Sequence, residues 1–241
     1  MKPLPHAPQV GLLTFASGCV DAVTLMAIGG SFTSVITGNL IFVGRAIGTS
    51  SLTPALHAIM AVAGYVLGVA AGSRLTHMSR PSARRAEWPQ AATVALAVEW
   101  GVLLAVSVAW IGYAAAPPAP VTDLMLAALA LALGIQGAAA RAITGSPSTT
   151  YMTGALTAVV EALSTGRRNA ADAMAAVGLA ALVAGAACGA ALVVYAPRAA
   201  LLPPLASLLL VIAIKARHHG KERRTLAAPV SCSHGVAGKP K

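Results

Sequence analysis

The stretch AMAAVGLAALVAGAACGAALVVYAP, residues 173–197, contains no charged side chain and is bounded by Asp172 and Arg198. A second charge-free stretch separates Arg45 from Arg74. An α-helix needs about 20 consecutive apolar residues to cross the hydrocarbon core of a bilayer, which is ~30 Å thick. Stretches of this length therefore predict an all-α protein that crosses a membrane several times.

The composition of the whole chain is typical of a membrane protein. Apolar residues make up 57% of its 241 residues and charged residues only 10%, against roughly 25% charged residues in a typical soluble protein. The formal net charge is +10, but the basic residues cluster in the loop 74–90 and after residue 214. Basic clusters beside apolar segments mark cytoplasmic loops under the positive-inside rule. The charge thus predicts orientation in a lipid bilayer, with no nucleic acid as partner.

Eight apolar segments follow one another along the chain, and two of them are short. They cover residues 10–29, 34–48, 54–76, 91–113, 122–144, 150–164, 172–195 and 199–216. The segments 34–48 and 150–164 fall below the roughly 17 to 25 residues that a helix needs to cross a bilayer. Each follows a stretch rich in Gly, Ser and Thr. We therefore expect about six transmembrane helices and two short, re-entrant half-helices, with eight full spans as the alternative.

An internal repeat is predicted to relate the two halves of the chain, about 10–113 and 122–216. A shift of 116 positions pairs seven identical residues, as expected for a duplicated unit. The pairs are Gly18 and Gly134, Ala22 and Ala138, Gly29 and Gly145, Thr33 and Thr149, Thr37 and Thr153, Gly38 and Gly154, and Leu40 and Leu156. Most of the shared residues are Gly and Thr, whereas coincidence in an apolar chain favours Ala and Leu.

The distribution of basic residues favours six spans over eight. With six spans, and with the tail and Arg141 left out of the count, seven basic residues face the cytoplasm and two face the other side. The seven are Lys2, Arg74, Arg80, Arg84, Arg85, Arg167 and Arg168, and the two are Arg45 and Arg198. With eight spans this asymmetry disappears, against the positive-inside rule. Six spans put both the segment 1–9 and a basic, disordered tail at 217–241 in the cytoplasm. Three spans in each half make the second half inverted, a recurrent transporter design.

Thr37-Gly38-Asn39 and the matching Thr153-Gly154 stand where the two short segments begin. Thr and Asn are good N-cap residues because their side-chain oxygens accept free backbone N–H groups. A helix N-terminus also carries about half a positive charge. The two starts are therefore candidate sites for a small polar or anionic solute. The alternative is that these residues only cap a turn or pack against a neighbouring helix.

Three charged residues lie deep within apolar segments: Asp21 in the first, Glu99 in the fourth and Arg141 near the end of the fifth. Charges at such depth are costly and usually face a partner or an aqueous cavity. One interpretation is a buried ion pair of Asp21 or Glu99 with Arg141. The other is that Asp21 lines the solute site and couples proton movement to transport. Gln136 is a candidate second polar group from the other half.

Glycines at four-residue spacing predict close helix contacts, at Gly64, Gly68 and Gly72 in one segment and at Gly185 and Gly189 in another. Rows of small residues let helices approach closely, and contacts in a homo-oligomer are the alternative. The His and Cys residues show no metal-binding spacing. No catalytic or cofactor-binding motif stands in a supporting context. We therefore expect no metal, no cofactor and no enzymatic activity.

The pattern Gly18-Cys19-Val20-Asp21-Ala22, then Phe32 and Thr37-Gly38-Asn39, resembles the YoaK-like family of uncharacterised bacterial integral membrane proteins. The resemblance extends through Tyr151-Met152-Thr153-Gly154 and covers roughly residues 10–215. The family has no known function, so the resemblance implies a multi-pass protein of the bacterial inner membrane without naming a solute.

The second half departs from this pattern, with Gly137 in the place of Asp21 and Ala155 in the place of Asn39. The first half is therefore expected to carry most of the polarity of any site. The leading hypothesis is a secondary transporter or permease for a small polar or anionic solute. A non-transporting scaffold or partner subunit and a passive channel are the alternatives.

Overall fold

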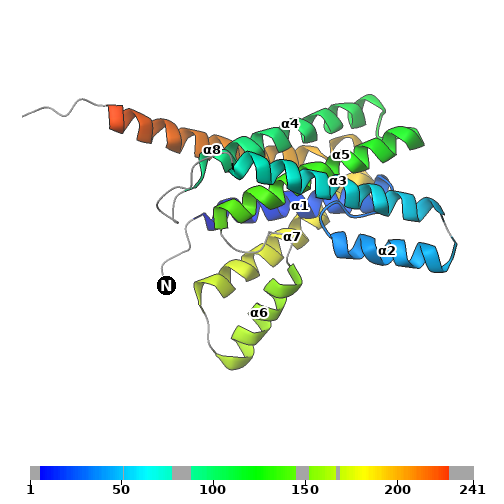
Figure 1. Ribbon diagram of the computed structural model, residues 1–241, viewed down its shortest axis with the longest axis horizontal. Coiled ribbons are helices and arrows are strands. Elements are labelled where there is room, and N and C mark those ends of the chain that lie inside the picture. The colour runs from blue at the N-terminus through cyan, green and yellow to red at the C-terminus, as the bar shows by residue number, and fades with distance from the viewer. Residues whose placement is uncertain (1–5, 51, 78–87, 145–151, 167–168, 228–241) are drawn as a thin grey trace, which may run out of the picture.

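The structure, a computed structural model, describes residues 6–50, 52–77, 88–144, 152–166 and 169–227, and every regular element within these ranges is helical. The elements are α1 (Ala7–Ala27), α2 (Ile36–Gly48), α3 (Leu52–His77), α4 (Gln90–Gly112), α5 (Ala119–Thr144), α6 (Met152–Thr165), α7 (Ala170–Tyr195), the short 3-10 helix η1 (Pro197–Ala199) and α8 (Leu202–Ala227). Most of the long helices lie side by side in one elongated bundle, from which α6 and the start of α7 project (Figure 1). The predicted all-α fold is confirmed.

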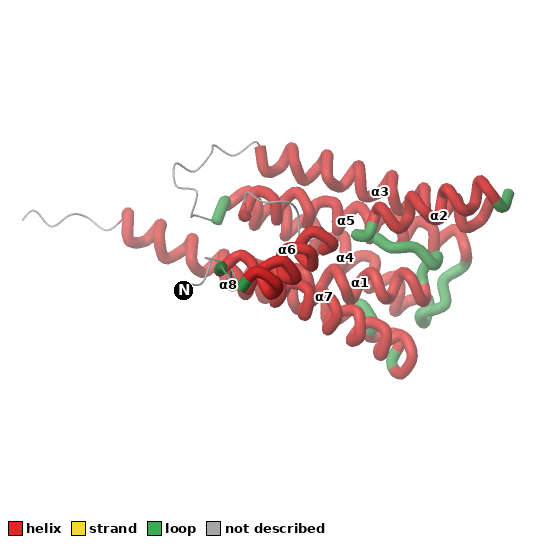
Figure 2. Tube along the Cα trace, turned by 90° about the horizontal axis from the view of Figure 1, so that it is seen from below, coloured by secondary structure: helices red, strands yellow, loops and turns green. Residues whose placement is uncertain are grey.

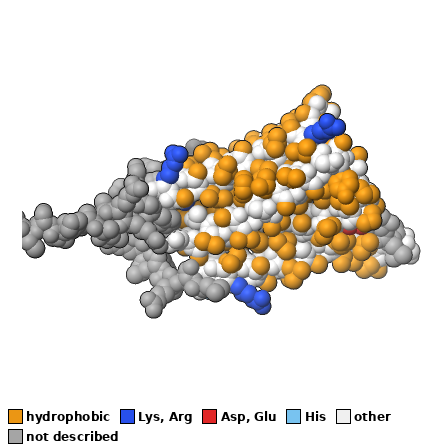
Figure 3. Space-filling view, turned by 90° about the horizontal axis from the view of Figure 1, so that it is seen from above, with side chains coloured by type: hydrophobic (Ala, Val, Ile, Leu, Met, Phe, Trp, Pro, Cys, Tyr) orange, Lys and Arg blue, Asp and Glu red, His pale blue; other side chains and the backbone are white. Residues whose placement is uncertain are grey.

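Six helices are long and apolar enough to cross a membrane, as the sequence predicts. They are Ala7–Ala27, Ala55–His77, Gln90–Gly112, Ala119–Ile143, Ala170–Tyr195 and Pro197–Arg217. Large apolar side chains such as Ile41, Val66 and Val183 are more than half exposed on the outer surface. Hydrophobic side chains cover most of the face seen in Figure 3, with Lys and Arg towards its margins. Such a surface is suited to lipid and not to water.

Glycines allow α3 to pack against α5 and α7 to pack against α1. A Cβ atom on Gly68 would collide with the carbonyl oxygen of Leu131 on α5, and one on Gly185 with that of Phe15 on α1. The other three glycines of the two rows, Gly64, Gly72 and Gly189, face the same partner helices. The absence of side chains at these positions lets the two backbones touch.

Two tryptophans tie α4 to the C-terminal part of the chain. Trp100 Nε1 donates a hydrogen bond to the Leu205 carbonyl of α8 (3.2 Å), and Trp110 Nε1 donates one to the Pro197 carbonyl of η1 (2.7 Å). Buried side chains of α1, α4, α5 and α8 form two apolar clusters. We name them the Leu103 cluster and the Leu96 cluster, each after one of its α4 residues.

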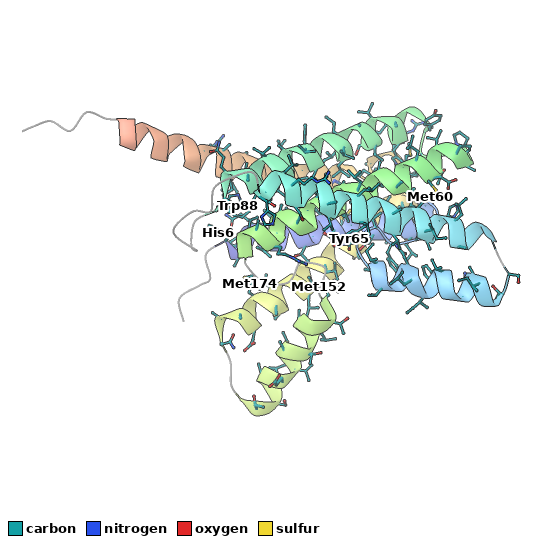
Figure 4. All side chains as sticks on the ribbon, in the orientation of Figure 1. His6, Met60, Tyr65, Trp88, Met152 and Met174 are labelled. Atoms are coloured by element: carbon teal, nitrogen blue, oxygen red, sulfur yellow. The ribbon has the colours of Figure 1, made fainter. Side chains whose placement is uncertain are left out.

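The two ends of the membrane region meet at one end of the bundle, which we call the terminal end. Lys215 Nζ on α8 lies 2.9 Å from His6 Nδ1 and 4.5 Å from the centroid of the Trp88 ring. The His6 and Trp88 rings pack edge to face with their centroids 5.2 Å apart, and Figure 4 labels both at this end. Because the chain enters and leaves the bundle here, it crosses the bundle an even number of times.

The last helix is longer than the sequence suggested. α8 continues to Ala227, so the first part of the segment 217–241, for which we expected disorder, is helical. Seven of the eleven residues 217–227 are Lys, Arg, Glu, Leu or Ala, which favour the helix, and the first proline beyond α8 is Pro229. Residues 228–241 lie outside the described part of the chain.

The second short helix, α6, packs along α7, and the two lie close together in the view of Figure 2. α7 begins with a capping box. The Asn169 side chain accepts the backbone N–H groups of Ala171 (2.8 Å) and Asp172 (3.0 Å), while Asp172 Oδ2 accepts the N–H of Asn169 (2.9 Å). These bonds satisfy free N–H groups of the first turn and so fix the start of α7.

Candidate functional site

The loop between α1 and α2 turns back into the bundle. Gly29 and Gly30 make the turn with φ angles of 79° and 64°, a conformation that glycine adopts without strain. Thr33 and Ser34 then hydrogen-bond to Asp21, which lies two turns before the end of α1. At 1.5 Å per residue this is a return of about 9 Å along the helix axis. α2 then leads outward beside α3 (Figure 1).

The Asp21 carboxylate holds this loop in place. Its Oδ1 accepts the backbone N–H groups of Thr33 (2.7 Å) and Ser34 (2.9 Å) and the Thr33 hydroxyl (2.8 Å). Its Oδ2 accepts the Ser34 hydroxyl. Asp21 is only 5% exposed, and a buried N–H group without an acceptor costs about 1–3 kcal/mol. The carboxylate therefore stabilises a stretch of backbone that has no helical partners of its own.

Asn39 provides a second anchor, from the first turn of α2. Its Nδ2 donates to the Phe32 carbonyl (2.6 Å) and its Oδ1 accepts the Phe32 N–H (3.0 Å). The N-cap of α2 is Val35, without a side-chain hydrogen bond. Thr37 and Asn39 therefore do not cap this helix as the sequence suggested, because Asn39 satisfies both of its polar atoms on the loop. Thr37 is exposed, and Gly38 packs beside the Phe32 ring.

Gln136 connects α5 to α1. Its Nε2 donates to the Leu13 carbonyl (3.0 Å) and to Ser17 Oγ (2.7 Å), one turn of α1 before Asp21. Gln136 is 1% exposed, and its Oε1 has no hydrogen-bond partner within the described ranges. The structure therefore brings Gln136 into the polar region of α1, with one acceptor left over.

Thr153 and Gly154 lie at the start of α6 and not beside Asp21. α6 packs chiefly along α7, and Thr153 is exposed on its first turn. The Thr153 carbonyl accepts the hydroxyl of Thr157 (3.0 Å). The stretch that would correspond to the Asp21-bound loop, residues 145–151, lies outside the described residues. That Thr153 and Gly154 bind a solute stays a prediction.

Arg141 forms no ion pair with Asp21 or Glu99, so that interpretation of the deep charges was wrong. Glu99 is 1% exposed on α4, and its Oε2 has no hydrogen-bond partner. The ion pair found among the described residues joins His57 and Asp123, with 2.9 Å between Nε2 and Oδ1. Arg141 stands in the last turn of α5, where the helix dipole favours a cation, whereas Glu99 is near the middle of α4.

A cavity of about 290 Å³ lies between the C-terminal halves of α3 and α5. Its polar lining consists of Tyr65, Ser73, Thr76 and His77 from α3 and Arg141 from α5, with no acidic side chain. Tyr65 is labelled in Figure 4. This cavity was not predicted from the sequence. The available signal was that Ser73, Thr76 and His77 stand three and four positions apart and so share one face of a helix.

Comparisons with known proteins identify a family and a transmembrane relative. A family model described as a protein of unknown function, DUF1275, matches residues 9–214. The UPF0700 transmembrane protein YoaK of Bacillus subtilis (strain 168) is 30% identical over 156 residues, which are 64% of this chain and 66% of YoaK. The match thus spans just under two thirds of that relative. No solved structure matches the chain.

The family match runs from the first turn of α1 into α8 and therefore includes the Asp21 loop, the α3–α5 cavity and Gln136. The resemblance read from the sequence motifs is confirmed. The chain belongs to the DUF1275 family of proteins of unknown function, and it is a multi-pass membrane protein distantly related to YoaK.

Proposed function

We propose that this chain is a secondary transporter of the bacterial inner membrane for a small anionic or polar solute, and that it is not an enzyme. The observation that carries the proposal is the cavity between α3 and α5, where Arg141 has no acidic neighbour in the lining. A guanidinium offers five N–H donors in a planar fork, which suits carboxylate and phosphate groups. A volume of about 290 Å³ is at the lower end for small-molecule sites, which favours a small solute.

Equivalent helix crossings support an internal repeat, with this cavity at the interface of its halves. Gly68 packs against Leu131, and Gly185 packs against Phe15. Phe15 and Leu131 are 116 positions apart, and Gly68 and Gly185 are 117 apart. The same shift relates a second pair of contacts, that of Gly18 with Leu182 and that of Gly134 with Tyr65. Nearly the same shift therefore relates the sequence identities and the tertiary contacts. The cavity lies between α3, which belongs to the first half, and α5, which belongs to the second.

The directions of the helices support an inversion between the two halves. A Cβ atom on Gly29, just beyond the end of α1, would lie 2.9 Å from Leu126 near the start of α5. At the other end of the same helices, Gln136 Nε2 of α5 donates a hydrogen bond to the Leu13 carbonyl of α1. The equivalent helices α1 and α5 therefore run in opposite directions. Inverted repeats with interrupted helices are a recurrent architecture of secondary transporters.

The basic side chains support a cytoplasmic location for the terminal end. Arg74, Arg141, Lys215 and Arg217 all belong to the parts of α3, α5 and α8 that reach this end. The positive-inside rule then puts both termini in the cytoplasm. A solute anion in the cytoplasm would meet Arg141 near the membrane surface.

Uptake by purified protein in liposomes tests the proposal. Radiolabelled phosphate, sulfate and small carboxylates are supplied outside, and saturable uptake of at least one of them is expected. Arg141→Gln should lower kcat/KM about tenfold or more, because a hydrogen bond to a charged group contributes about 1.5–3 kcal/mol. The matched control is Arg74→Gln. Arg74 is an exposed arginine on α3 at the same end of the bundle as Arg141, and it does not line the cavity. Its uptake should be unchanged.

The other outcomes oppose the proposal in distinct ways. Folded protein that takes up none of these anions would support the scaffold or partner-subunit alternative. Flux that rises linearly with concentration would support a passive channel. Truncation after Ala227 gives a further test, because a transporter should keep its uptake without the tail.

A further inference from the structure

Four buried polar residues, Ser17, Glu99, Gln136 and Ser207, form a layer across the middle of the bundle. They belong to α1, α4, α5 and α8, which pack against one another. Along its helix, each is flanked by a residue of the Leu96 cluster on one side and a residue of the Leu103 cluster on the other. The flanking pairs are Leu13 and Val20, Leu96 and Leu103, Ala139 and Leu133, and Leu208 and Leu205. We call these four residues the polar layer.

The polar layer contains two oxygen acceptors and lacks a donor for them. Glu99 Oε2 and Gln136 Oε1 are both buried without a hydrogen-bond partner in the described part of the chain. The hydroxyls of Ser17 and Ser207 cannot serve, because they donate to backbone carbonyls of their own helices. The amide Nε2 of Gln136 is likewise used, on α1.

We infer that the polar layer is a proton-binding site and that Glu99 carries the proton. An ionised carboxylate in an apolar interior is strongly unfavourable without a partner. One proton on Glu99 removes that charge and supplies the missing donor, and Gln136 Oε1 is the free acceptor at the same level of the bundle. Hard metal cations take six or more oxygen ligands, which is more than the side chains of the polar layer supply, so a proton suits the layer better.

Among the residues that the structure describes, no charged neighbour compensates Glu99. The ionisable side chains described on the elements packed against α4 are His57, Tyr65, Arg74 and His77 of α3, Asp123 and Arg141 of α5, Arg198 of η1, and Lys215 and Arg217 of α8. Within the described ranges, none of them forms an ion pair or hydrogen bond with Glu99. On α1, Asp21 is occupied by the loop that it anchors. The uptake and release of a proton at Glu99 therefore changes the charge of the layer by a full unit.

The inference rests on the proposed function only for its second step, in which the proton couples to solute movement. Ionisable residues inside membrane bundles commonly belong to proton relays. In such a cycle Glu99 takes a proton from water on one side of the membrane and returns it on the other. A proton-coupling role for Asp21 was one of the two interpretations open from the sequence, but the Asp21 oxygens accept four hydrogen bonds.

Infrared difference spectroscopy of the protein in lipid nanodiscs tests the proton site without any solute. As pH rises, wild type should lose a carboxylic-acid carbonyl band, and Glu99→Gln should lack this band. Glu161→Gln is the matched control, since Glu161 is exposed on α6, and it should keep the band. Gln136→Leu should shift the frequency of the band without removing it, because it removes the acceptor that we assign to the acid. A band that persists in Glu99→Gln, or that never changes with pH, overturns the inference.

Proton flux in liposomes tests the coupling step. With a pH-sensitive dye inside, the solute found by uptake measurements should drive acidification in wild type and not in Glu99→Gln. If Glu99→Gln keeps solute-driven acidification, transport stands and the Glu99 inference fails. If the infrared result holds but no solute moves, the proposed function fails and the proton site stands. A sodium site is the remaining alternative. If NaCl but not KCl raises the Tm of wild type, and Glu99→Gln abolishes this effect, the polar layer binds sodium and the proton inference is overturned.

Discussion

Two acidic residues in the bundle interior, Asp21 and Glu99, have opposite surroundings. Asp21 accepts hydrogen bonds from two residues of the returning loop, whereas Glu99 Oε2 accepts none. A polar group that is fully hydrogen-bonded stabilises the fold, and one that is not is available for a ligand or a proton. Hydropathy shows that both residues are deep, but it does not show which donors reach them. For Asp21, the donors come from Thr33 and Ser34, which are 12 and 13 residues further along the chain and beyond the end of α1.

Removing the Asp21 carboxylate should destabilise the protein. Asp21→Ala leaves the buried N–H groups of Thr33 and Ser34 without acceptors, which costs about 1–3 kcal/mol for each group. Thermal unfolding in detergent, followed by circular dichroism, should show a clearly lower Tm. Asp21→Asn should cost less, because its Oδ1 still accepts both N–H groups. A Tm for Asp21→Ala equal to that of wild type would show that the loop does not depend on this anchor.

At the scale of elements, the crossings of α3 with α5 and of α7 with α1 depend on backbone contact. Gly185 packs directly on the Phe15 carbonyl region of α1. On the same helix, a Cβ atom on Gly178 would meet no atom within 4 Å. Spacing alone predicted the five glycines of the two rows, all of which meet a partner helix, but it missed Gly18 and Gly134, which also lie against a partner backbone.

Alanine substitution should separate these two kinds of glycine. Gly185→Ala forces α7 away from α1 and should lower the free energy of unfolding by about 1–3 kcal/mol, as overpacking usually does. Gly178→Ala should be neutral or stabilising by up to ~1 kcal/mol, because alanine favours the helix. Equilibrium or thermal unfolding of both variants in detergent gives the comparison. Equal effects at the two positions would mean that the close crossing is not required.

At the scale of the whole molecule, α2 decides the number of crossings. The loop returns to Asp21 before α2 begins, so α1 and α2 both lead towards the end of the bundle at which α3 starts (Figure 1). The contact of His6 with Lys215 requires an even number of crossings, which both six and eight spans satisfy. The return of the loop, and not the position of the termini, therefore separates the two topologies.

Cysteine labelling at Thr49, the residue after α2, should distinguish them. In a protein whose Cys19, Cys188 and Cys232 have been replaced by serine, Thr49→Cys should react with an impermeant maleimide on the side opposite the N-terminus. Six spans with a returning loop require this result, since α2 does not complete a crossing. A tag at the N-terminus reports its side in the same cells. Labelling on the same side as the tag would instead establish eight spans.

Much of this protein can be predicted from its sequence, because the signals are local. Hydropathy gives the membrane helices, and the short segment 34–48 is recognisable as α2 from its length. The motif around Asp21 identifies the family. The prediction of a disordered tail from residue 217 was wrong for residues 217–227, which belong to α8. Most of these residues are polar and also favour a helix, so their composition suits a solvated helix as well as a solvated tail.

The sequence by itself determined that the chain lies in a membrane, how many long helices it has, and that Asp21 and Glu99 are deep, whereas Arg141, which was also expected to be deep, is exposed in the last turn of α5. Only the tertiary structure decided that Asp21 anchors a loop, that Arg141 lines a cavity between α3 and α5, and that Glu99 and Gln136 share a layer without a donor. The reason is physical. Burial of a helix follows from its own residues, whereas a hydrogen bond depends on the direction and distance of a group from elsewhere in the chain.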